Sequence, residues 1–293
     1  MAEPGEPIFV GAAASTPTGL VGRLLDAHPR LATLPVEARF HSDDRGIPGL
    51  LGGQIGIDDF LEMLRGPWWE GADGEPGLAA VVPRERLEAA AERFRDSYHR
   101  DPIAASRELF FSVLAPEARE SRLVEASPAN MRQAQTLVRL FPEARFVHVV
   151  RDGRDVACAA ADGSRPRLAP GVGRWAAELR EIEAAVRGEE DGASYAIPPG
   201  SVEVIVLDQL AAGDREGSYQ ELLAALALDD DAAPRAFLER LDAAQIGRGA
   251  WRERVRGPAA WALGRRYRRA LDTLSREGNR AAPPLIEAHE RLG

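Results

Sequence analysis

The segment with the clearest chemical potential is PIFVGAAASTPTGLVGRLLDAHP, residues 7–29. An apolar strand pattern ends at Gly11, a short loop of small and hydroxyl-bearing residues follows, and a helix pattern begins near Thr18. Compared with the phosphate-binding motif G-x-x-x-x-G-K-[ST], Gly11 and Thr18 are in place, but Thr16 replaces the second Gly and Pro17 replaces the Lys. If this loop binds an anion, it does so without the usual cation.

Backbone geometry alone can make such a loop an anion site. A strand–loop–helix turn aims several backbone N–H groups and the positive end of a helix dipole at one point. We expect Thr18 to cap the helix, with Pro17 in its first turn. The alternative is a plain capped turn without a ligand. The candidate anion-binding residues are Ala13, Ala14, Ser15, Thr16, Thr18 and Gly19.

A second cluster of reactive side chains lies in VEARFHSDD, residues 36–44. It contains Glu37, Arg39 and His41, so that a carboxylate, a guanidinium and an imidazole fall within five residues. The Glu37 carboxylate could accept the proton of an attacking hydroxyl. His41 is a second candidate base, because an imidazole titrates near neutrality. The alternatives are a solvated Glu37 paired with Arg39 and an exposed His41.

The elements that must position these residues follow from the apolar pattern. Nearly continuous apolar runs predict buried parallel strands, and amphipathic segments between them predict helices. This alternation predicts an α/β fold with three layers and a central, mostly parallel sheet of four or five strands, with Gly11 at the carboxyl end of a central strand. The runs span residues 7–11, 145–150 and 202–207, with weaker candidates at 30–35 and 122–127. We interpret residues 1–293 as one domain, with a cap-like helical segment at about 57–118 and a helical region at about 232–293.

The amino-acid composition argues against some classes of binding partner. The net charge is −9 and all 37 basic residues are Arg, which disfavours nucleic acid and anionic membranes as partners. Cys158 is the single cysteine, so no internal disulfide or cysteine-based metal cluster is expected, and no metal site is predicted. The sequence shows no signal-peptide pattern and no apolar run long enough to cross a bilayer. We expect a cytoplasmic enzyme and leave monomer and homodimer open.

Three stretches together resemble the sulfotransferase family. The first is GAAASTPTGLVGRLLDAHPRLATLPVEARFH, which is similar to that family's strand, G-x-P-R-S-G-T-[TS] loop and LLDAHP turn. The second, LVEASPANMRQAQTLVRLFPEARFVHVVRDGRDVACAA, resembles its E-K-[TS]-P-x-N segment and its strand ending in V-R-D-[PG]-R-D. VEVIVLDQL and GRGAWRERV are looser matches to a later strand and to a late G-x-W-R loop.

The resemblance implies a P-loop-like sulfotransferase fold and the donor 3′-phosphoadenosine-5′-phosphosulfate (PAPS). It implies that the first loop holds the 5′-phosphosulfate and that Arg151 holds the 3′-phosphate, a role that suits a planar guanidinium. The late loop adds Arg248, Trp251 and Arg252 as candidate donor-binding residues. The segment around Glu37 is similar to that of tyrosylprotein sulfotransferases, which implies that Glu37 is the general base and that Arg39 helps to hold it.

Three polar positions of the family pattern are alanine here. Ala14 replaces the loop Arg, Ala126 replaces the Lys that supports the transferring sulfuryl group, and Ala159 replaces a Ser that holds the 3′-phosphate. Removing one preorganised donor from such a site typically costs two to three orders of magnitude in rate. PAPS binding is therefore either maintained by backbone donors and arginines from elsewhere or lost. Candidates for such arginines are Arg132, Arg248 and Arg252.

Three hypotheses follow. The first is a sulfotransferase acting on a hydroxyl of a small metabolite or natural product, with a degenerate but compensated donor site. The second is an enzyme of the same fold that performs PAPS-independent acid–base chemistry, such as cyclisation or elimination, in a biosynthetic pathway. The third is a non-catalytic binding protein. The retained Arg151 favours the first, and the three alanines favour the second.

Overall fold

The computed structural model describes residues 6–72, 74–118, 121–160, 168–188, 197–242 and 244–292. Its central sheet has five parallel strands in the order β2-β5-β1-β6-β7. They are β1 (Ile8–Ala12), β2 (Leu31–Thr33), β5 (Arg122–Glu125), β6 (Arg145–Val150) and β7 (Val202–Val206). All five predicted strands are therefore confirmed.

Strand β1 lies at the centre of the sheet and pairs in parallel with both β5 and β6. All five of its residues are buried, as expected for a strand covered on both faces. Gly11 lies next to its carboxyl end, also as predicted. A Cβ at Gly11 would lie 2.6 Å from the backbone nitrogen of Met131, so glycine allows the short helix η2 (Pro128–Met131) to approach the strand closely.

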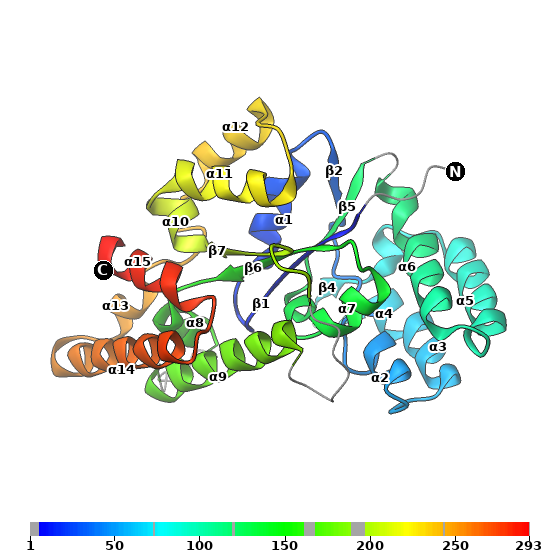
Figure 1. Ribbon diagram of the computed structural model, residues 1–293, viewed down its shortest axis with the longest axis horizontal. Helices are drawn as coiled ribbons and strands as arrows, with labels where there is room; N and C mark the ends of the chain where they lie inside the picture. Colours follow the sequence, from blue (N-terminus) through cyan, green and yellow to red (C-terminus); the bar gives the residue numbers. More distant parts are fainter. Residues whose placement is uncertain are drawn as a thin grey trace.

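Helices cover both faces of the sheet, which gives the predicted three layers (Figure 1). On one face Ile8, Val10 and Val147 pack against α1 (Thr18–Asp26), α10 (Leu207–Ala212), α11 (Arg215–Leu226) and α12 (Ala232–Arg240). On the other face Phe9 and Phe146 belong to the core formed with α6 (Pro102–Ala118), α7 (Ala134–Leu140), α9 (Leu168–Arg187), α14 (Gly257–Arg276) and α15 (Ala282–Leu292). The alternation of strand side chains between the two cores follows from the two-residue period of a strand.

The two segments expected to be helical are mainly so. The first contains α3 (Ile57–Arg65), α4 (Pro67–Glu70), α5 (Arg84–Tyr98) and α6, preceded by α2 (Ile47–Leu51). It also holds η1 (Leu78–Ala80) and a two-stranded antiparallel sheet of β3 (Gly71–Ala72) and β4 (Glu75–Pro76). These strands are too short to leave a sequence pattern. The C-terminal segment contains α12, α13 (Ala250–Arg254), α14 and α15.

Candidate functional site

The loop after β1 lies at the carboxyl edge of the sheet, directly before α1. Its backbone is turned tightly: Thr16 donates its N–H to the Ala13 carbonyl, Thr18 donates to the Thr16 carbonyl, and Ser15 has a φ of 62°. The prediction that Thr18 caps the helix is wrong. Pro17 is the N-cap, and Thr18 is the first helical residue. The Thr18 hydroxyl donates to the Ala126 carbonyl at 2.8 Å, because the helix start packs against the end of β5.

A carboxylate from a distant helix contacts the loop. Glu178 of α9 accepts a hydrogen bond from the backbone N–H of Ala14, with a distance of 2.7 Å to its Oε2. Ala14 is the position where the family pattern has an arginine. The backbone N–H of Ala14 was expected to donate to an anionic ligand. It donates instead to the carboxylate of Glu178.

A pocket of about 630 Å³ joins the loop to the end of β6. Ser15, Thr16 and Arg151 line it, together with Ala159 of α8 (Gly153–Ala159) and residues of the segment that leads into α13. The structure therefore brings the predicted loop and the predicted Arg151 to one pocket, although Thr16 and Arg151 are 135 positions apart in sequence.

Arg151 is held in this pocket with part of its hydrogen-bonding capacity unused. Its side chain is buried, with 4% exposed, and its Nη2 donates to the Gly247 carbonyl at 2.8 Å. Its Nε has no hydrogen-bond partner among the described residues. A buried guanidinium with an unpaired N–H is costly unless an anion or water satisfies it. This geometry is suitable for binding an oxyanion.

Arg254 of α13 lines the same pocket and was not among the predicted residues. Its Nη1 lies 3.3 Å from the Cys158 carbonyl, next to Ala159. It therefore carries a cation to the position where the family pattern has a serine. The sequence signal was present in GRGAWRERV, in which Arg254 is the second arginine after the tryptophan.

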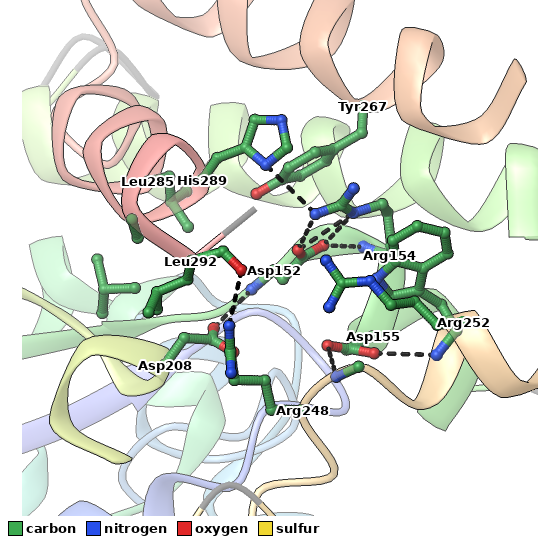
Figure 2. A pocket seen from close by; sticks show the side chains of 14 residues that line it. Asp152, Arg154, Asp155, Asp208, Arg248, Arg252, Tyr267, Leu285, His289 and Leu292 are labelled. Atoms are coloured by element: carbon green, nitrogen blue, oxygen red, sulfur yellow. Dashed lines mark hydrogen bonds and ion pairs between the residues drawn. The ribbon is translucent and has the colours of Figure 1, made fainter. Parts of the chain in front are cut away.

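Arg248, Trp251 and Arg252 line a different and much smaller cavity, of about 20 Å³ (Figure 2). Arg248 donates to the Leu292 carbonyl at 2.8 Å, and the Arg252 guanidinium lies 5.1 Å from the Trp251 ring. Asp155 links the two cavities, since it lines both and accepts hydrogen bonds from the backbone N–H groups of Gly249 and Trp251. These three residues are not in the pocket that contains the loop.

The small cavity is strongly charged. Arg154 pairs with Asp152 at 2.5 Å and lies over the rings of Trp251 and Tyr267, at 4.4 and 4.6 Å from their centroids. Asp208 is buried and accepts the backbone N–H of Asp152 at 3.0 Å, while its second oxygen has no partner among the described residues. Burial, with the nearby charge of Asp152, raises the pKa of Asp208 to about 6.

Glu37 and Arg39 are exposed and line a depression of about 240 Å³ with Ser127 and Arg132. Pro128 lines both this depression and the pocket with Arg151, so the two adjoin there. Arg39 lies 3.5 Å from the carboxylate of Asp43. The predicted base and the predicted anion loop thus face neighbouring spaces.

His41 is in a different environment. It is fully buried, and its Nε2 lies 3.0 Å from both Glu125 Oε2 and Asn130 Oδ1. Ser127 and Asn130 also donate to Glu125, at 2.6 Å each. These hydrogen bonds and the contact with His41 hold the pKa of the buried Glu125 at about 2, against the opposing effect of burial. Because His41 is buried, the alternative of an exposed loop histidine is wrong. His41 does not line the depression, and its role as a second candidate base stays a prediction.

Comparisons with known proteins agree with this architecture. A family model described as "Sulfotransferase family" matches residues 7–231. The chain belongs to the sulfotransferase family. A search of curated proteins gives no match. Among solved structures, the chain is similar to the sulfotransferase domain of the olefin synthase from Synechococcus PCC 7002. The sequence identity is 17% and the TM-score is 0.52, and the match covers 93% of this chain and 95% of that chain.

A second similar structure, a sulfotransferase from Alicyclobacillus acidocaldarius, has 19% identity, covers 86% of this chain and 100% of that chain, and has a TM-score of 0.44. The described part of this sulfotransferase-family chain contains no group of three or more His, Cys, Asp or Glu side chains that could hold a metal ion. None of its described helices is long and apolar enough to span a bilayer.

Proposed function

We propose that the protein is a sulfotransferase that takes PAPS as donor and a hydroxyl of a small molecule as acceptor. The observation that supports this most directly is the pocket in which Arg151, with an unpaired buried Nε, faces the loop residues Ser15 and Thr16. A guanidinium opposite a strand–loop–helix turn is an arrangement for a ligand with two anionic groups. A 3′-phosphate and a 5′-phosphosulfate are such a pair.

The residues around Arg151 fit a phosphate. Arg254 adds a second cation beside Ala159, and the Ser15 and Thr16 hydroxyls lie in the same pocket. In this proposal Arg151 and Arg254 bind the 3′-phosphate. Arg248, Trp251 and Arg252 act indirectly, by fixing the segment that Asp155 holds through Gly249 and Trp251. Gly247 of that segment in turn accepts a hydrogen bond from Arg151.

PAPS would supply the sulfuryl group for transfer to the acceptor oxygen, with adenosine 3′,5′-bisphosphate as the leaving group. The chain would supply the proton acceptor, Glu37, from the depression that adjoins the pocket at Pro128. Its carboxylate takes the hydroxyl proton as the oxygen becomes nucleophilic. Arg39 and Arg132 line the same depression and offset the charge of Glu37. In this proposal the acceptor is a small molecule of a biosynthetic pathway, and the protein acts in the cytoplasm.

One observation favours the second hypothesis, PAPS-independent acid–base chemistry. The Glu178 carboxylate bonded to Ala14 N–H would repel a sulfonate or phosphate at the loop, and Ala14 and Ala126 provide no cation to offset it. Under this alternative Glu37 remains the base, and the loop is a structural turn closed by Glu178. A non-catalytic binding protein has no such use for an exposed carboxylate beside the pocket.

Calorimetry with adenosine 3′,5′-bisphosphate separates these hypotheses. The sulfotransferase proposal expects a dissociation constant in the micromolar range, and at least about tenfold weaker binding by Arg151→Gln, because a charge-assisted hydrogen bond is worth roughly 1.5–3 kcal/mol. The control is Arg107→Gln, which alters an arginine of α6 that pairs with Glu143. Absence of binding at millimolar nucleotide would contradict PAPS use and leave the acid–base alternative.

A further inference from the structure

A third cavity lies away from the loop and the depression. Helices α9 and α14 run side by side (Figure 1), and a groove of about 1010 Å³ is formed along them. On α14 the lining residues recur every three or four positions, from Ala259 through Ala262, Arg266 and Ala270 to Thr273. On α9 they do the same at Ala169, Val172, Ala176 and Arg180. The apolar members of these two rows form the floor of the groove. They are Ala259, Ala262 and Ala270 on α14 and Ala169, Val172 and Ala176 on α9.

This groove contains an unusual aromatic residue. Trp261 lines the groove, and 61% of it is exposed. No other large hydrophobic residue in the described part of the chain is exposed. The Arg265 guanidinium lies 4.7 Å from its ring centroid. Exposed aromatic and arginine side chains beside an apolar groove are typical of protein-binding surfaces.

The groove has a uniform charge although the chain as a whole is acidic. Arg180, Arg265, Arg266 and Arg269 line it, and none of its lining residues is acidic. Arg180 pairs with Glu277 at 2.7 Å. Within the described ranges, no ion pair joins Arg265, Arg266 or Arg269 to a carboxylate. Arg266 reaches across to α9, because a Cβ on Gly173 would lie 3.2 Å from its Nη2. In a chain with a net charge of −9, these arginines place positive charge on an otherwise apolar groove.

We propose that this groove binds an acidic, amphipathic α-helix of a protein partner. Its apolar floor matches the apolar face of such a helix, and its arginines match acidic side chains that flank this face. The stretch from Ala259 to Thr273 is about 22 Å long at 1.5 Å per residue, which corresponds to about four turns of a bound helix. A second copy of the chain, docked about a two-fold axis at this groove, would bring the arginines of both copies together. The proposal is independent of the reaction.

The test uses a synthetic helical peptide of about 15 residues, with Leu and Ala on one face and Glu on the other, titrated while Trp261 emission is recorded. Trp261→Phe identifies the signal of that residue. We expect a dissociation constant below about 100 µM for the wild type. We expect at least tenfold weaker binding by the double variant Arg266→Glu, Arg269→Glu. The matched control is Arg268→Glu, Arg276→Glu, which makes the same charge change on the same helix outside the groove.

Three results would overturn the proposal. The first is no saturable binding of the acidic peptide, or equal binding of a peptide in which Lys replaces Glu. The second is binding to vesicles of anionic phospholipid, but not to the peptide, lost in Arg266→Glu, Arg269→Glu, which would identify a membrane surface. The third is a dimer in sedimentation velocity that this double variant converts to monomer, which would identify a second copy as the occupant.

Discussion

The carboxylate of Glu178 on α9 accepts a hydrogen bond from the backbone N–H of Ala14 at 2.7 Å. The two residues are 164 positions apart, and they meet because α9 covers the sheet face next to the loop after β1. An anion of the protein therefore contacts the turn that was predicted to bind the anion of a ligand. The balance between these two anions decides between the two enzymatic hypotheses.

Glu178→Gln is expected to tighten the binding of adenosine 3′,5′-bisphosphate by about tenfold, because it removes a negative charge from the loop while keeping an acceptor for Ala14 N–H. Glu181→Gln, an exposed position on the same helix, is the control and should leave binding unchanged. Calorimetry at low and high salt measures the effect, which should shrink with salt. Unchanged or weaker binding by Glu178→Gln would show that this carboxylate does not oppose the ligand.

Arg254→Ala should weaken binding of the same nucleotide by about tenfold or more, since it removes a cation from the pocket that contains Arg151. Arg248→Ala should have a smaller effect, because Arg248 contacts the Leu292 carbonyl in the other cavity. Isothermal titration of both variants provides the comparison. A larger loss for Arg248→Ala would restore the assignment implied by the family resemblance.

Glu37→Gln should lower turnover by roughly 10²–10⁴ if Glu37 is the base, with little change in stability because the side chain is exposed. His41→Asn should act differently. It removes a buried partner of the ionised Glu125 and should lower the free energy of unfolding by about 3 kcal/mol. Steady-state rates and urea unfolding measure the two effects. Near-normal turnover of Glu37→Gln would remove Glu37 as the base.

Asp208→Asn should stabilise the protein at neutral pH. The folded-state pKa of Asp208 is raised from 3.8 to about 6, so its ionisation costs stability as the pH rises through that range. Below about pH 3 the Asp208 carboxyl is protonated in both the folded and the unfolded state, so the variant should match the wild type. Above pH 6 we expect a gain of about 3 kcal/mol, measured by urea unfolding from pH 3 to pH 8. Exposed Asp272→Asn is the control, and a gain that is constant with pH would contradict the assignment.

The sequence by itself determined the five strands, their burial and the position of Gly11, because continuous apolar runs leave a local pattern and tight packing requires glycine. It also indicated the family, through motifs that keep their order along the chain. The burial of His41 was not predictable, because a polar neighbourhood in sequence does not reveal that Glu125 and Asn130 lie against its ring.

Only the tertiary structure decided which arginine lines which cavity and which carboxylate contacts the loop after β1. Arg248 and Arg254 are six residues apart on one motif, yet the packing of α13 places them in different cavities. Glu178 has no motif and reaches Ala14 only through the position of α9. Contacts between residues far apart in the chain depend on how helices pack on the sheet, and local sequence patterns do not encode that arrangement.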